Sequence, residues 1–175
     1  VTGCENTDSA EVVISSPPSV TAEVATQAFS EIHVIIATAV GDGEYEYSLD
    51  GGPWQSSGTF EDVSFGGHIV TARDVNGCGQ AEVPVTVLDY PHFFTPNGDG
   101  RNETWNIVGF SGMAGTKIYI FDRFGKLLKQ ISPSGTGWDG TYNGSPMPSS
   151  DYWFTVEYTE DGQQKQFRAH FTLKR

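Results

Sequence analysis

An alternation of apolar and polar side chains in the last third of this chain restricts it to a β-sheet fold more than any other feature. In residues 152–158 aromatic and aliphatic side chains occupy every second position, and the same period returns in residues 167–173. An Asp161-Gly162 turn signal lies between the two runs. Because successive side chains of a strand point to opposite faces, the pattern predicts an antiparallel hairpin with one buried face. The apolar face of its second strand should comprise Phe167, Ala169, Phe171 and Leu173.

The rest of the chain has the same character. Its 175 residues include 21 Gly, 9 Pro and 13% aromatic residues, and no long segment has a helical period. A second hairpin is predicted in residues 116–131, with Arg123-Phe124-Gly125 at its tip. Short strands with turn signals about every 8–12 residues are typical of immunoglobulin-like sandwiches. We therefore predict an all-β fold of two tandem immunoglobulin-like β-sandwich domains.

Charge divides the chain into two parts. Residues 1–90 contain Arg73 as their only Lys or Arg, against fourteen Asp and Glu, whereas residues 91–175 contain nine basic and eight acidic residues. This step predicts a boundary between domains at 1–89 and 90–175. The acidic first half argues against binding to nucleic acid, whose phosphates it would repel. No segment approaches the roughly 20 apolar residues of a transmembrane helix, so we expect no membrane insertion.

Within the first half, a strand is predicted in residues 31–40. Its apolar residues are expected on one face, and its polar residues, with His33 among them, on the other. The expected buried face comprises Ile32, Val34, Ile36 and Val40.

Two segments of the first half resemble each other. Gly3-Cys4 is followed by AEVVIS, and Gly77-Cys78 is followed by AEVPVTV. A repeat of about 70–75 residues indicates a tandem array, with residues 1–15 as the tail of a preceding unit and the chain as a piece of a longer protein. Two alternatives for the cysteines stay open. Cys4 and Cys78 form a disulfide, or they are equivalent positions of successive repeats and lie a domain apart.

Catalytic motifs are missing from the sequence. It contains no nucleophile elbow, zinc-binding helix motif, phosphate-binding loop or Cys-x-x-Cys pair, and its four histidines lack ligand spacing. Asp122 and Asp139 both stand beside turn residues, where Asp is expected for backbone reasons. We predict that the protein is not an enzyme.

The polar segment 94–103, FTPNGDGRNE, is the strongest candidate for a binding site. Hard cations such as calcium require several oxygen ligands held by a sharply turning backbone. The segment does not fit an EF-hand, because Thr95 and Asn106 stand where carboxylates are needed. The alternative is a structural turn whose Asn and Asp side chains bond to their own backbone. The candidate calcium ligands are Asn97, Asp99, Asn102 and Glu103.

Tryptophans raise the possibility of a second kind of site. Exposed, coplanar indole rings would favour a carbohydrate-binding module, whereas buried rings would fill the core of a small sandwich. The four tryptophans are Trp54, Trp105, Trp138 and Trp153.

Four blocks of the second half, in order and spacing, resemble the type B sorting domain, the gliding-motility-associated C-terminal domain of type IX secretion substrates in the Bacteroidetes phylum. The blocks are FFTPNGDGRNETW (93–105), KIYIFDRFGKLL (117–128), GTGWDGTYNGSPMPSSDYWFTVEY (135–158) and FTLKR (171–175). The chain departs from the usual pattern at Asn102-Glu103, where Asn-Asp is common, and at Phe124, where Trp is common.

The first half is similar to the SprB-type repeat of large surface adhesins, through YEYSLDGGPWQSSGTFEDV (45–63) and GGHIVTARDVNGCG (66–79). The two resemblances imply the C-terminal end of a gliding adhesin. They further imply export across the outer membrane to the cell surface or medium, through a type IX translocon assisted by a PorP/SprF-like outer-membrane protein. A folded signal needs a distinctive surface, and the basic outer face of the last hairpin is our candidate. The residues predicted for recognition by the translocon are Arg123, Arg168, His170, Lys174 and Arg175.

Overall fold

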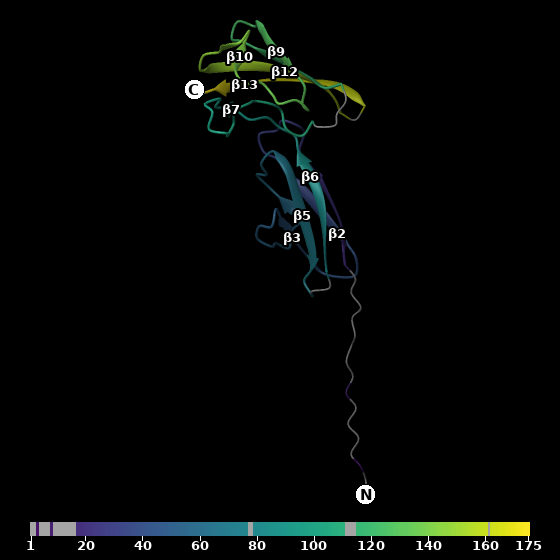
Figure 1. Ribbon diagram of the computed structural model, residues 1–175. Coiled ribbons are helices and arrows are strands. Elements are labelled where there is room, and N and C mark those ends of the chain that lie inside the picture. The colour runs from purple at the N-terminus through teal and green to yellow at the C-terminus, as the bar shows by residue number, and fades with distance from the viewer. Residues whose placement is uncertain (1–2, 4–7, 9–16, 77–78, 111–114, 161) are drawn as a thin grey trace.

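The computed structural model describes residues 3, 8, 17–76, 79–110, 115–160 and 162–175. Every regular element in these ranges is a β-strand, which confirms the predicted all-β fold. The strands before Asp89 and those after it belong to different sheets. Figure 1 shows the two groups of strands arranged end to end.

Two three-stranded antiparallel sheets form the first half. One sheet has the order β1-β2-β4, with β1 at Ser19–Val24, β2 at Ile35–Val40 and β4 at Thr59–Phe60. The other has the order β3-β5-β6, with β3 at Tyr45–Leu49, β5 at Gly66–Asp74 and β6 at Gln80–Val87. Side chains from both sheets meet in one core, so the sheets pack face to face. This core contains Ile35, Ala37, Tyr47, Phe60, Val63, Val70, Ala72, Val85 and Val87.

The buried face of β2 is the opposite of the predicted one. Ile35 and Ala37 are buried, whereas Ile36 and Val40 are 40% and 66% exposed. His33, which was expected on the polar side, is also buried. Apolar side chains occupy consecutive positions here, so the alternation fits two phases equally well. The hydrophobicity of the strand does not decide which face is buried. The hydrogen-bond partners of the buried His33 do.

A five-stranded sheet of order β7-β13-β12-β8-β9 forms the second half. Its strands are β7 (Phe93–Phe94), β8 (Lys117–Phe121), β9 (Leu127–Ile131), β12 (Ser150–Glu160) and β13 (Gln163–Leu173). Neighbouring strands are antiparallel except β7, which runs parallel to β13. Both predicted hairpins are confirmed, and β12 pairs with β13 along the full length of each strand.

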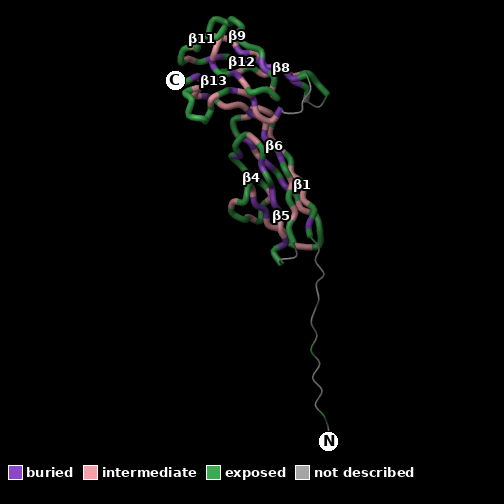
Figure 2. The backbone as a smooth tube through the Cα atoms, viewed as in Figure 1, coloured by how far each residue is buried: buried purple, intermediate pink, exposed green. Residues whose placement is uncertain are grey.

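The layer opposite this sheet consists mainly of loops. Its regular part is a short ribbon of β10 (Thr141–Tyr142) and β11 (Ser145–Pro146), and an isolated bridge joins Trp105 to Trp138. Figure 2 shows buried segments in both halves. The core of the second half contains Phe94, Trp105, Ile107, Phe110, Ile118, Ile120, Leu128, Ile131, Trp138, Tyr152, Phe154, Val156, Tyr158, Phe171 and Leu173.

Phe29, in the loop before β2, connects the two halves. Its ring stacks on Phe167 with a centroid distance of 4.1 Å and an interplanar angle of 6°. Its main-chain N–H donates to the carbonyl oxygen of Leu88 at 3.3 Å. Other rings within 6.2 Å are Tyr90, Phe110 and Tyr158. A residue of the first half therefore packs against the core of the second.

Asp89 is held by residues from both sides of the boundary. Its Oδ2 lies 2.9 Å from Nε2 of the buried His33. Its main-chain oxygen accepts a hydrogen bond of 2.9 Å from the N–H of Val108. The polar groups at this junction therefore have partners although water is largely excluded.

Candidate recognition surface

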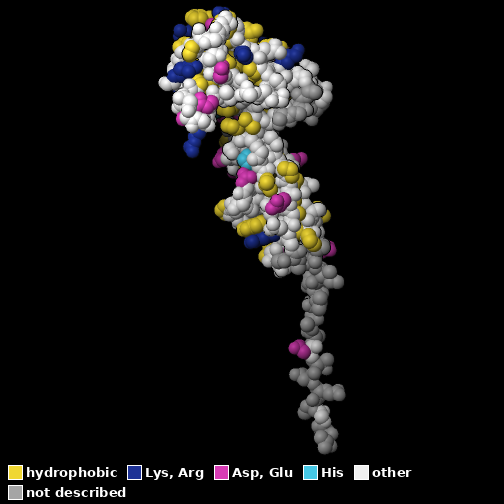
Figure 3. Space-filling model, in the orientation of Figure 1, with side chains coloured by type: hydrophobic (Ala, Val, Ile, Leu, Met, Phe, Trp, Pro, Cys, Tyr) yellow, Lys and Arg dark blue, Asp and Glu magenta, His cyan; other side chains and the backbone are white. Residues whose placement is uncertain are grey.

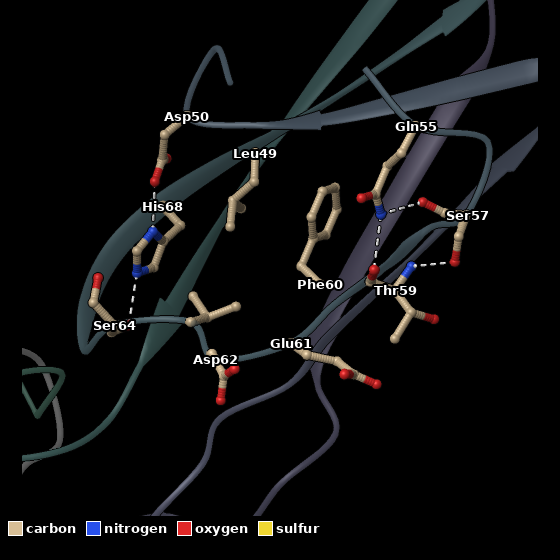
Figure 4. Close-up of a pocket in the computed structure, with 11 residues that line it drawn as sticks. Leu49, Asp50, Gln55, Ser57, Thr59, Phe60, Glu61, Asp62, Ser64 and His68 are labelled. Carbon is tan, nitrogen blue, oxygen red and sulfur yellow. Dashed lines mark hydrogen bonds and ion pairs between the residues drawn. The ribbon is translucent and has the colours of Figure 1, made fainter. Parts of the chain in front are cut away.

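A pocket of about 580 Å³ in the first half contains a histidine between an aspartate and a serine (Figure 4). His68 Nδ1 lies 2.7 Å from Asp50 Oδ2, but His68 Nε2 is bonded to the main-chain oxygen of Ser64 at 2.8 Å. In a hydrolase triad Nε2 must face the hydroxyl of the nucleophile. The cluster instead ties the turn after β3 to the start of β5.

The pKa and the backbone conformation of Asp50 both fit this structural role. The hydrogen bond from His68, followed by that from the N–H of Ile69, lowers the pKa of the Asp50 carboxyl below its ordinary value, while burial acts in the opposite direction. Its φ of 51° lies in the left-handed region, which Asp tolerates better than most residues. A structural explanation therefore accounts for the geometry of this pocket.

The segment 94–103 forms a turn held together by its own side chains. Glu103 accepts hydrogen bonds from the N–H groups of Gly98 (3.0 Å) and Gly100 (2.9 Å). Asp99 accepts from the N–H of Arg101 at 2.7 Å and from the amide of Asn97 at 3.0 Å. Both glycines have a φ of 82°, a conformation that favours glycine.

Three of the four candidate calcium ligands thus meet in this turn, and the fourth, Asn102, contributes its main-chain oxygen to the N–H of Thr95 at 2.7 Å. The hydrogen bond from Asn97, then that from Arg101, lowers the pKa of Asp99. Within the described residues, no three His, Cys, Asp or Glu side chains are placed to hold a metal ion together. Calcium binding stays a prediction, and the hydrogen bonds alone explain the order of the turn.

Arg175, predicted to contact the translocon, has a structural role in its own domain. Its guanidinium donates to the main-chain oxygens of Met147 (3.1 Å), Pro96 (3.2 Å) and Gly140 (3.1 Å). These carbonyls lie in the 94–103 turn and beside the β10–β11 ribbon. The side chain therefore links three segments of the loop layer.

The other predicted recognition residues lie in separate places. Arg168 and His170 are exposed on the outer face of β13. The Lys174 Nζ lies 4.3 Å from the centroid of the Phe93 ring. Arg123 lies in the β8–β9 turn, with its guanidinium 5.2 Å from the Phe124 ring. Only the first two share a face in the middle of the sheet.

Sequence reasoning assigned no role to the apolar residues beside Arg168 and His170. The strand register aligns Leu127, Phe121, Trp153 and His170 across four neighbouring strands. We call these four residues the outer row. Trp153 is 42% exposed and Leu127 is 48% exposed. The signal was present in the sequence, because Trp153 occupies an outward position of an amphipathic strand.

Two tryptophans are fully buried and belong to the core. Trp105 donates its indole N–H to the oxygen of Pro91 at 2.7 Å, and Trp138 donates to the oxygen of Thr141 at 2.8 Å. Trp54, in the first half, is partly covered by Arg73 at 4.0 Å from its ring. The predicted sugar-stacking platform is therefore not favoured.

Two further predictions concern the cysteines and membrane insertion. Cys4 and Cys78 lie outside the described residues, so their disulfide stays a prediction. The ranges that the structure describes include no helix suited to crossing a membrane.

Comparison with solved structures finds distant likenesses. The three N-terminal domains of the bacteriophage RB49 highly immunogenic outer capsid protein (Hoc) share 11% identity over 90% of this chain and 70% of that chain, with a TM-score of 0.36. The BSP domain of a biofilm-associated protein shares 12% identity over 91% and 29%, with a TM-score of 0.27. Immunoglobulin domains 1–4 of Sidekick-1 share 10% identity over 88% and 49%, with a TM-score of 0.26. Likenesses this weak support no inference about function.

Comparison with curated proteins finds no match. A family model described as the CHU_C type IX secretion signal domain matches residues 88–173. The matched segment contains the five-stranded sheet, the aromatic core and the 94–103 turn. A type IX secretion signal domain, which is a sorting module and not a catalytic one, is therefore detected in the second half of this chain.

Proposed function

We propose that residues 90–175 direct a cell-surface gliding adhesin through the type IX secretion system, and that residues 1–89 are the last adhesin repeat ahead of this signal. The observation that carries the proposal is the agreement between the family match, residues 88–173, and a hydrophobic core whose buried residues all lie in the same segment. A signal recognised after folding must be rigid. Fully buried rings, with their few rotatable bonds, favour such rigidity.

The finer parts of the proposal rest on the resemblances in the sequence. We infer that the two halves are tandem immunoglobulin-like domains and that a PorP/SprF-like outer-membrane protein assists the translocon. We further infer that the protein reaches the surface of a Bacteroidetes cell. The face-to-face sheets of the first half support the sandwich for that half. The loop layer of the second half is an irregular version of the same architecture.

A secretion assay tests the function. A folded fluorescent reporter is fused ahead of Val1 of the complete chain and expressed in a bacterium with a working type IX system. We expect the reporter outside the outer membrane, and we expect a matched fusion that lacks residues 88–175 to stay in the periplasm. Equal periplasmic retention of both fusions, with the complete chain folded, would contradict the proposal.

Deletion of residues 163–175 tests whether export requires the last strand of the signal. β13 lies between β12 and β7 and contributes Phe171 and Leu173 to the core. Its loss should expose the core. The free-energy cost should be comparable to the whole stability of such a domain, roughly 5–10 kcal/mol, so the signal should unfold. We expect export to fail. Normal export of this deletion would show that the fold is not what the machinery recognises.

A further inference from the structure

We propose that the outer face of the five-stranded sheet is the surface by which the signal domain docks onto a partner protein that presents an apolar centre with acidic groups around it. This inference rests on the proposed secretion function and specifies which face is recognised. It is carried by the alignment of exposed side chains across the strands, and by the charge of the residues beside them.

The outer row forms the centre of this face. Trp153 of β12 pairs with Phe121 of β8 on one side and with His170 of β13 on the other. Phe121 in turn pairs with Leu127 of β9. The rings of Trp153 and His170 lie 6.2 Å apart, so they are neighbours on the surface. Core packing explains none of these side chains, because the opposite face of the sheet supplies the core.

A second row runs beside the first. It consists of Arg168 on β13, Thr155 on β12 and Tyr119 on β8, which lie opposite one another in the ladder. Tryptophan, tyrosine and arginine are the residue types most enriched at the energetic centres of protein interfaces. Phe93, 44% exposed on the adjoining β7, extends the apolar area toward Lys174.

The basic side chains of this face favour a partner surface that carries acidic groups. The face carries two acidic side chains. Asp151 accepts from Thr172 at 2.7 Å, and Glu157 accepts from Gln166 at 3.3 Å and lies opposite the exposed Lys117 of β8 in the ladder. Arg168, by contrast, forms no ion pair with the described residues. Lys117 is exposed on the same face, and Lys174 lies over the Phe93 ring at its edge. The side of the molecule visible in Figure 3 also carries most of its basic side chains on the second half.

These features disfavour pairing of this face with the same face of a second copy. A symmetric contact would bring the basic residues of both copies together, and like charges placed opposite each other are repulsive. A partner with an apolar centre and an acidic border would pack against the outer row and form an ion pair with Arg168. A distinct partner protein is therefore the occupant that the chemistry favours.

The test compares four variants of the reporter fusion of the 175-residue chain with the wild type. The double variant Leu127→Thr/Trp153→Thr removes the apolar centre but keeps strand-forming residues, and Arg168→Glu reverses the charge beside it. The matched control, Val40→Thr/Ile69→Thr, changes two residues of the first half that are 66% and 49% exposed. We expect the double variant to lower export about tenfold or more, as loss of an interface centre does. Arg168→Glu should lower export several-fold, Arg168→Lys should retain most of it, and the control should match the wild type.

The outcomes separate this inference from the function on which it rests. Failure of the wild-type fusion to leave the periplasm would overturn the secretion function itself. Export of the wild type, the double variant and Arg168→Glu at equal rates would overturn the docking face and leave the function intact. Circular dichroism of each purified chain checks the fold. If the double variant unfolds, the comparison of Arg168→Glu with Arg168→Lys decides, because this exposed side chain contributes nothing to the core. A dimer of the wild-type chain that Arg168→Glu dissociates would also overturn the proposal, because the occupant would then be a second copy.

Discussion

The two halves of this chain close a β core in different ways. In the first half two three-stranded sheets face each other, and branched aliphatic side chains such as Ile35, Val70 and Val87 fill most of the space. In the second half one sheet faces loops, and large rings such as Trp105 and Trp138 occupy the space between them. The difference shows that aromatic side chains can replace a second sheet, because a large ring reaches across an irregular gap and loses little conformational entropy on burial.

The arrangement of charged side chains also differs between the halves, although each half has a cation over an aromatic ring, as Arg73 lies over Trp54 in the first. The first half contains an ion pair between Arg73 and Glu46 at 2.8 Å, in addition to its two histidine–aspartate pairs. In the second half Lys126 lies 4.4 Å from the Tyr142 ring, much as Lys174 lies over Phe93. Cations over aromatic rings are held in place without being neutralised. The second half therefore combines an ordered surface with positive charge, which suits a domain that is to be recognised.

The largest expected effect tests the importance of the loop layer. Trp105→Ala should destabilise the second half by about 3–5 kcal/mol, because it removes a fully buried ring that stacks on Phe171 at 3.9 Å. The conservative change Ile35→Val should cost the first half about 1 kcal/mol. Urea unfolding followed by fluorescence and circular dichroism measures both. A cost below about 1 kcal/mol for Trp105→Ala would show that the loops are not part of the cooperative core.

The next change tests whether the halves are independent. Phe29→Ala should destabilise the second half by about 2–3 kcal/mol, because it leaves a cavity beside Phe167 and Tyr158. Thermal unfolding of the complete chain should show the transition of the second half at a lower temperature. As a control, Ile32→Ala changes a 56% exposed residue of the same loop and should leave that transition in place. An unchanged transition in Phe29→Ala would restore the picture of two separate domains.

A smaller effect separates two adjacent basic residues. Arg175→Gln should cost about 1–2 kcal/mol, because three carbonyl oxygens lose a charged donor. Lys174→Gln should cost less than about 0.5 kcal/mol, since the exposed side chain contributes little beyond its contact with Phe93. The melting temperatures of the two variants provide the comparison. Equal values would remove the structural role of Arg175.

The 94–103 turn gives a test of calcium. Asp99→Ala should lower the melting temperature of the second half, because the N–H of Arg101 and the amide of Asn97 lose their acceptor. If calcium also occupies the turn, a chelator lowers the melting temperature of the wild type and leaves the variant unaffected. No response of the wild type to chelator would leave the hydrogen-bonded turn as the full explanation.

The smallest effect is a pH dependence of the first half. The pKa of Asp50 is lowered in the folded chain, chiefly by the hydrogen bond from His68. Its contribution to stability is therefore present above the unfolded-state pKa of about 4 and is lost as pH falls through the lower folded-state value. Asp50→Asn should reduce the loss of stability of the first half as pH falls below about 4. An identical pH profile in both proteins would contradict this assignment.

Local patterns in the sequence predicted a substantial part of this fold. The β12–β13 hairpin and its buried face were predictable because alternation and a turn signal agree there. The face of β2 was not, because consecutive apolar residues fit either phase and the interaction of His33 with Asp89 spans 56 positions of the chain. The three acceptors of Arg175 and the stacking of Phe29 on Phe167 are likewise long-range contacts. Contacts of this kind leave no periodic signature in a single sequence.

The position of Phe29 has a consequence for how a passenger and its signal mature. A signal whose core is completed by a ring from the preceding domain reaches full stability only when that domain has folded and holds its loop in place. Export that depends on a folded signal would then also depend on the folding state of the cargo next to it. A first half that fails to fold would then withhold one aromatic side chain from the core of the second.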